Sequence, residues 1–262
     1  MINLRAVVAA LKQESYHFFA DPQWVIPSLV APFTFTIVTL MLFKDFDGPV
    51  ALYAVLGGGV LGMWGNTLYA SGWSVSFDRM NGTLEPLMVT PTPIIQVIAG
   101  RAIWNSAIGL LNALAVFVDA EIAIGTGMRL GDPFMFFALL MLTLLSLSTV
   151  GLMLSAFFVM TRSSSVLMRI LELPIYLLSG ALIPITYLPD AIKPLSYLLG
   201  PAWGVDALRV AAGISDEYIS SLGLLSNVML MLALTLAYIT IAIILFRHME
   251  QRARISGTLG RW

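Results

Sequence analysis

Six long apolar stretches take up most of this chain and are separated by short polar segments. Each is close to or above the roughly 20 residues that a helix needs to cross a bilayer. The stretches are Trp24–Phe43, Val50–Trp73, Ile94–Val118, Phe134–Met160, Val166–Ile183 and Leu222–Phe246. Only 11% of the residues are charged, compared with about 25% in soluble domains. The sequence therefore predicts an all-α integral membrane protein with six transmembrane helices, built as a single domain over residues 1–262.

The residues before the first stretch have the pattern of a helix lying on a membrane. Their apolar side chains, from Leu4 to Leu11, fall on one helical face, whereas Arg5 and Lys12 fall elsewhere. An amphipathic helix of this kind lies in the membrane interface. We expect an interfacial helix over residues 1–22 rather than a cleavable signal, with a soluble packing helix as the alternative.

The distribution of basic residues predicts the orientation of the chain. Lysine and arginine gather in cytoplasmic loops. If the N-terminus is cytoplasmic and the chain crosses six times, most of the 14 Lys and Arg residues fall inside. The predicted outer loops are instead rich in aspartate, as at Asp45, Asp47 and Asp190. We therefore expect both termini to be cytoplasmic.

A charged segment, SFDRMNGTLEPLMVTPTP, separates the second and third stretches. It covers residues 76–93, and the predicted orientation places it in the cytoplasm. Gly82, Pro86 and Pro91 limit the length of any helix within it. Arg79 and Glu85 offer charged contacts to a protein outside the membrane. The alternative is that they belong to a solvated loop.

A second irregular segment precedes the last stretch. Proline is too frequent there for one continuous helix, yet the segment is too apolar for a solvated loop. We predict short re-entrant helices over residues 184–204 that dip into the outer leaflet. Their defining prolines and aromatic anchors are Pro184, Tyr187, Pro189, Pro201 and Trp203.

Two charges fall inside the fifth stretch. Arg169 and Glu172 are three residues apart, a spacing that lets side chains pair on a helix. Ionisable residues within the membrane are candidates for function. The pair is therefore a candidate intramembrane charge pair, with either a structural role or a role in transport.

The motifs of soluble enzymes are missing from the sequence. It contains no Walker-type GxxxxGK[ST], H-E-x-x-H or G-x-S-x-G motif, and no cysteine. We predict no catalytic, cofactor-binding or metal-binding residue in this chain. A stand-alone carrier or channel is an alternative, although it would usually show intramembrane charges along a path. A membrane-embedded transferase is a less favoured alternative, because it would need acidic or histidine residues clustered at one face.

Two motifs in this order resemble the ABC-2 family, the membrane subunits of type V ABC exporters. The first comprises Asp78, Arg79, Gly82, Thr83, Leu84 and Glu85, followed by Val89-Thr90-Pro91. The second runs from Leu178 to Pro189 and from Pro201 to Arg209. Asp78 stands where a glutamate is commoner in that family.

The resemblance implies the transmembrane subunit of an ATP-binding cassette exporter in the cytoplasmic (inner) membrane of a prokaryote. It implies a separate nucleotide-binding subunit, present in two copies, that binds ATP and Mg. It also implies a second membrane subunit, forming a homodimer or heterodimer, and no nucleic acid. The six residues of the first motif would form a coupling helix that contacts the ATPase subunit.

The region before the first span bears on the cargo. Asp21-Pro22-Gln23-Trp24 stands where polysaccharide exporters carry a basic, aromatic run. This difference favours a drug, antibiotic or lipid exporter, with a polysaccharide or glycolipid exporter as the alternative.

Overall fold

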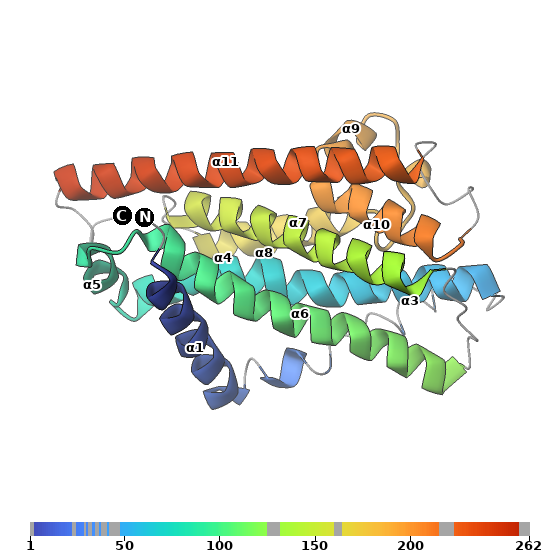
Figure 1. The fold of residues 1–262 in the computed structure, drawn as a ribbon, viewed down its shortest axis with the longest axis horizontal. Coiled ribbons are helices and arrows are strands. Elements are labelled where there is room, and N and C mark those ends of the chain that lie inside the picture. The colour runs from blue at the N-terminus through green and yellow to red at the C-terminus, as the bar shows by residue number, and fades with distance from the viewer. Residues whose placement is uncertain are drawn as a thin grey trace.

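The structure is a computed structural model that describes most of the chain. It describes residues 3–22, 25–28, 48–124, 132–159, 164–214 and 223–256, together with a few single positions between 30 and 41. The described residues form helices and no strand. The long helices lie roughly side by side in an elongated bundle, with both termini toward the end that holds α5 (Figure 1). The first expected span, Trp24–Phe43, lies mostly outside the described residues.

Among the described residues, three helices are long and apolar enough to cross a membrane. They are α6 (Ile94–Ile124), α7 (Pro133–Val159) and α11 (Leu224–Ser256), with apolar spans at Ile94–Asp119, Pro133–Phe157 and Leu224–His248. They match the third, fourth and sixth predicted stretches. The prediction of an all-helical membrane protein is therefore confirmed, whereas six separate spans remain a prediction.

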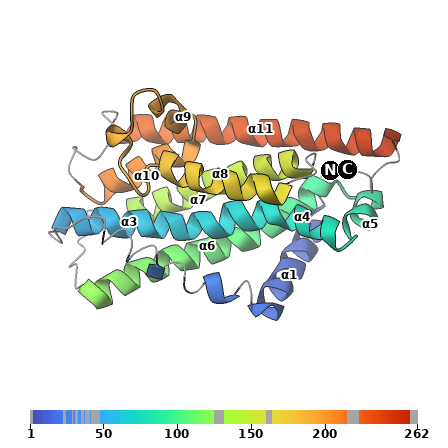
Figure 2. The same cartoon turned by 180° about the vertical axis from the view of Figure 1, so that it is seen from behind.

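The second predicted stretch forms a rod of three successive helices. The α-helix α3 (Gly48–Trp64) is followed by the π-helix η1 (Gly65–Ala70) and by α4 (Ser71–Met80). A π-helix is wider than an α-helix and usually appears as a single turn at a functional site. The rod runs along the bundle toward α5 (Leu84–Val89), as Figure 2 shows from behind. This end of the rod carries the segment singled out in the sequence.

Helix α8 (Ser164–Leu178) is shorter than the predicted fifth stretch. It has 15 residues and contains Pro174, so at 1.5 Å per residue it is about 22 Å long. That is less than the roughly 30 Å hydrocarbon core of a bilayer. The side chains of Arg169 and Glu172, the candidate charge pair, lie outside the described residues.

The segment before α11 is compact and largely helical. It contains η2 (Ile185–Tyr187), α9 (Lys193–Tyr197) and α10 (Gly200–Ala211). The last of these continues seven residues beyond the predicted end at residue 204, and most of its side chains are buried. It packs between α7 and α11 at the end of the bundle opposite α5 (Figure 1). Pro201 and Trp203 lie inside this buried helix, whereas Tyr187 and Pro189 are exposed.

The N-terminal helix α1 (Leu4–Ala20) crosses the bundle and packs on α6. A Cβ atom added to Gly100 of α6 would lie only 2.3 Å from the carbonyl oxygen of Val7. The two backbones therefore approach as closely as they do because residue 100 has no side chain. At its start, the backbone N–H of Asn3 donates to Oε1 of Gln96, 3.1 Å away.

Candidate functional site

The charged segment of residues 76–93 forms a helix, a tight turn and a short second helix. We call it the coupling segment. Helix α4 ends with two bonds typical of a Schellman motif, from Thr83 N–H to the Asp78 carbonyl (2.8 Å) and from Gly82 N–H to the Arg79 carbonyl (3.2 Å). Gly82 has a φ of 67°, in the left-handed region that glycine adopts without a steric cost. The glycine of the first motif is thus required by the turn between α4 and α5.

Asp78 is buried and bound to an arginine of a neighbouring helix. Its carboxylate accepts two hydrogen bonds from Arg101 of α6, at 2.5 Å from Nη1 and 3.2 Å from Nη2. The hydroxyl of Thr83 also donates to it, at 3.0 Å. Asp78 is 6% exposed and Arg101 is 3% exposed. The bidentate geometry is the strong form of an ion pair, and it fixes the root of the coupling segment on α6.

Arg101 also connects the coupling segment to α1. Its Nε atom lies 3.7 Å from Oε2 of Glu14, and its Nη2 atom donates to Oε1 of Gln13 at 3.4 Å. Burial raises the pKa of Glu14, although the positive charge of Arg101 opposes that shift. The guanidinium of Arg101 therefore contacts two carboxylates, Glu14 of α1 and Asp78 of α4.

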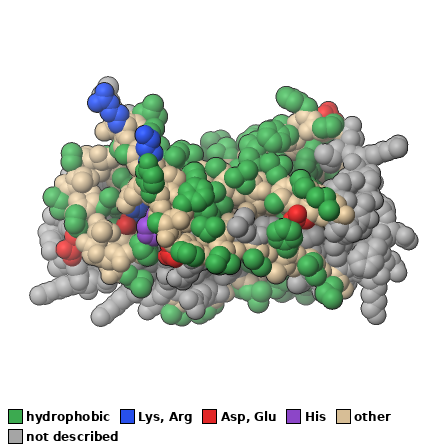
Figure 3. Space-filling view, turned by 90° about the horizontal axis from the view of Figure 1, so that it is seen from below, with side chains coloured by type: hydrophobic (Ala, Val, Ile, Leu, Met, Phe, Trp, Pro, Cys, Tyr) green, Lys and Arg blue, Asp and Glu red, His purple; other side chains and the backbone are tan. Residues whose placement is uncertain are grey.

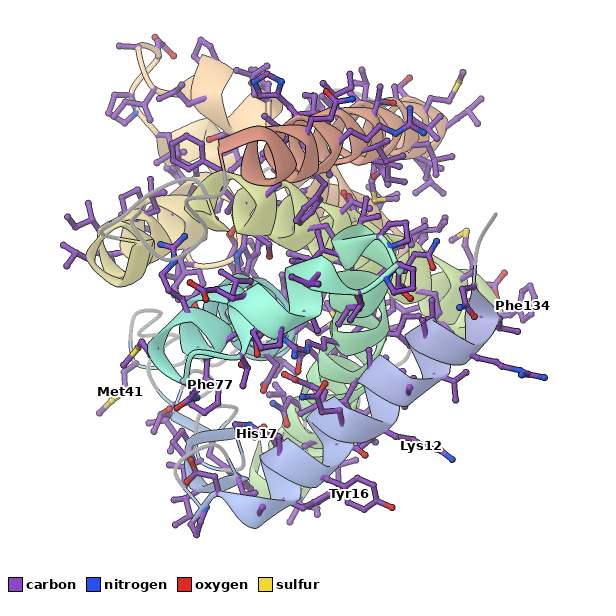
Figure 4. All side chains as sticks on the ribbon, turned by 90° about the vertical axis from the view of Figure 1, so that its left-hand side faces the viewer. Lys12, Tyr16, His17, Met41, Phe77 and Phe134 are labelled. Carbon is purple, nitrogen blue, oxygen red and sulfur yellow. The ribbon has the colours of Figure 1, made fainter. Side chains whose placement is uncertain are left out.

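These residues line a polar cavity of about 360 Å³ between α1, α4 and α6. His17 of α1 packs edge-on against Phe77 of α4, with ring centroids 4.6 Å apart. Figure 4 shows the two side chains directed toward each other, whereas Lys12 and Tyr16 point away from the bundle. The coupling segment and α1 are therefore joined across the cavity by the contact of His17 with Phe77 and by Arg101.

The tip of the coupling segment presents a mixed surface. Glu85 is exposed, and so are Met80 (73%) and Val89 (78%). Arg79 is half-buried. Leu84 is buried instead, in a small apolar cluster with Ile94 and Phe246. The predicted contact residues thus divide into an exposed set that can meet a partner and a buried pair, Asp78 and Leu84, that holds the tip in position. Thr83 is exposed, and its hydroxyl binds Asp78.

The sequence did not identify Arg101, Glu14, Met80 or Val89 as parts of the site. Arg101 carried a usable signal, because it is a charged residue two turns inside an otherwise apolar helix, where charges mark functional sites. Glu14 carried none, since its position against Arg101 depends on how α1 crosses α6.

Within the described residues, no group of three or more histidine, aspartate or glutamate side chains could hold a metal ion. The polar groups of the site are arranged to bind one another and to present a surface. This arrangement suits a mechanical connection between elements.

The comparison with known families agrees with this geometry. A family model described as ABC-2 type transporter matches residues 5–212, which include α1, the rod, the coupling segment and α10. No curated protein matches the chain. The chain therefore belongs to the ABC-2 type transporter family, as a membrane permease subunit that is not itself catalytic and that works with a partner ABC ATPase.

Proposed function

We propose that this chain is the transmembrane subunit of an exporter that moves a drug-like, lipid or other amphipathic substrate out of the cytoplasm. Export is inferred from the family resemblance, and this cargo class is favoured by the sequence pattern before the first span. Two copies of the ATPase would bind ATP and Mg, and two membrane subunits, identical or different, would enclose the substrate path. The cytoplasmic membrane, with both termini and the coupling segment on the cytoplasmic side, is the setting that the basic residues favour.

The observation that carries the proposal is the division of the coupling segment into an exposed tip and a buried root. An exposed tip with Met80, Glu85 and Val89 fits a cleft on a soluble partner, because apolar anchors beside charges are typical of specific interfaces. A root fixed by the pair of Asp78 and Arg101 resists bending. A push on the tip would therefore move α4 and α6 together.

The route of the movement follows from the continuous helical rod. ATP binding would draw two ATPase subunits together, and each would displace the coupling segment that it holds. The displacement would pass through α4 and η1 into α3, and through Arg101 into α6 and α1. Packed helices move as units between discrete arrangements, which suits a transporter that alternates between inward and outward access.

Charge reversal at the tip tests the proposal. Glu85→Arg, at an exposed position, should leave folding nearly unchanged, since surface substitutions usually alter stability by about 0.5 kcal/mol or less. Arg79→Glu changes a half-buried position, so its thermal unfolding is measured alongside. At an interface the same change can cost about 2–5 kcal/mol, because it leaves a partner's charge unpaired. We expect both variants to insert normally and to lose stable association with the ATPase, which co-purification in mild detergent would measure.

A matched control is available at the opposite end of the bundle. Asp190 is an exposed carboxylate near α9, and Asp190→Lys reverses a charge far from the coupling segment. This control should keep the ATPase bound. If Arg79→Glu and Glu85→Arg both bind the ATPase and transport normally, Arg79 and Glu85 of the coupling segment are not the contact.

A further inference from the structure

One face of α1 is not covered by the part of the chain that the structure describes. Its exposed side chains are Leu4, Arg5, Val8, Lys12, Tyr16 and Phe19. The opposite face, with Ala10 and Glu14, packs toward α6. Four of the six exposed side chains are large and apolar or aromatic. We call these six residues the outer face of α1.

The charges of α1 are sorted between its two faces. Arg5 and Lys12 both lie on the outer face, seven residues or about two helical turns apart, which is about 10 Å along the axis. The only acidic residue between Leu4 and Ala20 is Glu14, which lies on the inner face against Arg101. The outer face therefore carries positive charge alone, next to apolar surface.

A shallow hollow lies between the two basic side chains. It is lined by Leu4, Arg5, Val8, Ala9 and Lys12, and the small side chain of Ala9 leaves it open. Figure 3 shows basic side chains projecting beside hydrophobic surface toward the end of the molecule at which α1 lies. The hollow itself is apolar, and Arg5 and Lys12 flank it, so an anionic group can meet the two cations at its edges.

We propose that the outer face of α1 is a docking surface for anionic phospholipids of the leaflet on which it lies. The lipid phosphate would lie between Arg5 and Lys12, and Leu4, Val8 and Phe19 would enter the boundary between headgroups and acyl chains. Charge complementarity selects the lipid class, because zwitterionic headgroups carry no net charge. Each basic residue near an anionic membrane contributes about fivefold in affinity, so the two together contribute about 30-fold.

The same helix connects the lipid surface to the coupling segment. Glu14 contacts Arg101, and Arg101 holds Asp78. If the proposed coupling function is correct, the lipids beneath α1 influence how the coupling segment is seated. The lipid docking itself does not depend on that function.

Lipid retention by the full-length chain tests the docking. The protein is reconstituted in nanodiscs that contain phosphatidylcholine and phosphatidylglycerol in a ratio of about seven to three. The lipids that stay bound when the protein is released from the nanodisc are counted by native mass spectrometry. The wild type should retain phosphatidylglycerol preferentially. The double variant Arg5→Gln, Lys12→Gln should lose most of that preference, by up to about 30-fold.

Two controls separate charge from other effects. The exchange Arg5→Lys, Lys12→Arg keeps both charges and should keep the preference, whereas Lys193→Gln removes a basic residue elsewhere and should not change it. Equal retention of phosphatidylglycerol by the wild type and the double glutamine variant would overturn the proposal. Loss of ATPase association in that variant with unchanged lipid retention would also overturn it, and would assign the outer face to an acidic protein surface. Because the measurement needs no ATPase, it stays separate from the test of coupling.

Discussion

The Nη2 atom of Arg209 donates a hydrogen bond to the carbonyl oxygen of Gly180, 2.7 Å away. This contact joins the last turn of α10 to the residues that follow α8. The hydroxyl of Tyr53, from α3, donates to the same oxygen at 3.2 Å, and the guanidinium of Arg209 lies 3.9 Å from the centre of the Tyr53 ring. Two helices, α3 and α10, therefore meet at one carbonyl group just after the end of α8, and Arg209 is fully buried there.

Removing the charge at this junction should destabilise the bundle. Arg209→Met leaves Asp206, 3.6 Å from the guanidinium, as a buried carboxylate without its cation, which costs about 3–5 kcal/mol. Tyr53→Phe removes one hydrogen bond and should cost about 1 kcal/mol. Thermal unfolding in detergent measures both. A smaller loss for Arg209→Met than for Tyr53→Phe would contradict the central role of the arginine.

The buried pair of Asp78 and Arg101 gives a second stability prediction. Asp78→Ala leaves the guanidinium without its main partner and should cost about 3–5 kcal/mol. Replacing both residues with methionine should cost less, because neither member of the pair is then left as a buried charge, although Glu14 also loses its contact with Arg101. Asp190→Ala, which breaks the exposed pair with Lys193, is the matched control and should change the unfolding temperature little. Equal losses in the single and double variants would show that the pair is not coupled.

The buried carboxylate of Glu14 predicts a dependence of stability on pH. Its pKa in the folded protein is raised above the ordinary value of 4.5, mainly by burial. Between 4.5 and the raised pKa, the folded state keeps a proton that the unfolded state has lost, so the contribution of Glu14 to stability falls as pH rises. Glu14→Gln should remove this part of the slope in unfolding temperatures measured across that range. An unchanged slope would mean that Glu14 ionises equally in both states.

The close approach of α1 to α6 should not tolerate a larger residue at position 100. Gly100→Ala would bring a methyl group against the Val7 carbonyl, so α1 must shift, at a cost of about 1–3 kcal/mol. Gly223→Ala is the control, because nothing lies within 4 Å of an added Cβ there. We expect a lower unfolding temperature for Gly100→Ala alone. Indistinguishable variants would indicate that α1 is loosely held.

The predicted orientation can be tested by cysteine labelling, because the chain has no cysteine of its own. Asn81 in the coupling segment and Asp190 near α9 are both exposed, so either position should accept a label without damage to the fold. An impermeant thiol reagent added to intact cells should label Asp190→Cys and should label Asn81→Cys only after the membrane is opened. The reverse pattern would invert the topology.

The elements predictable from sequence were those that depend on local composition. The apolar stretches that form α6, α7 and α11 are long enough to identify a membrane helix without knowledge of the helices packed against it. Gly82 and the following prolines marked the turn between α4 and α5 because the backbone conformation there is set by a few adjacent residues. The predicted re-entrant segment ended at residue 204, whereas the helix that begins within it, α10, continues to Ala211.

The parts that escaped prediction depend on contacts between distant residues. Asp78 was expected to face a partner protein, yet Arg101, 23 residues later, binds it inside the chain. Leu84 was assigned to the same surface and is buried against Phe246 from α11. Sequence spacing identifies neighbours within one helix but not across two, so the inner and outer residues of the coupling segment could be separated only in the structure.

The π-helix of residues Gly65–Ala70 determines which way the coupling segment faces. Each residue of an α-helix rotates the chain by about 100° around the axis, and a π turn accommodates an additional residue within an otherwise α-helical rod. Closing that turn to α-helical geometry with every residue kept would rotate Asp78 by about 100° relative to α3 and turn it away from Arg101, whereas deleting one residue would restore the original facing. The orientation of α4 around the rod axis relative to α3 is thus set by a single turn. A transporter in which that turn changes between π-helical and α-helical geometry would rotate its coupling segment without bending any helix.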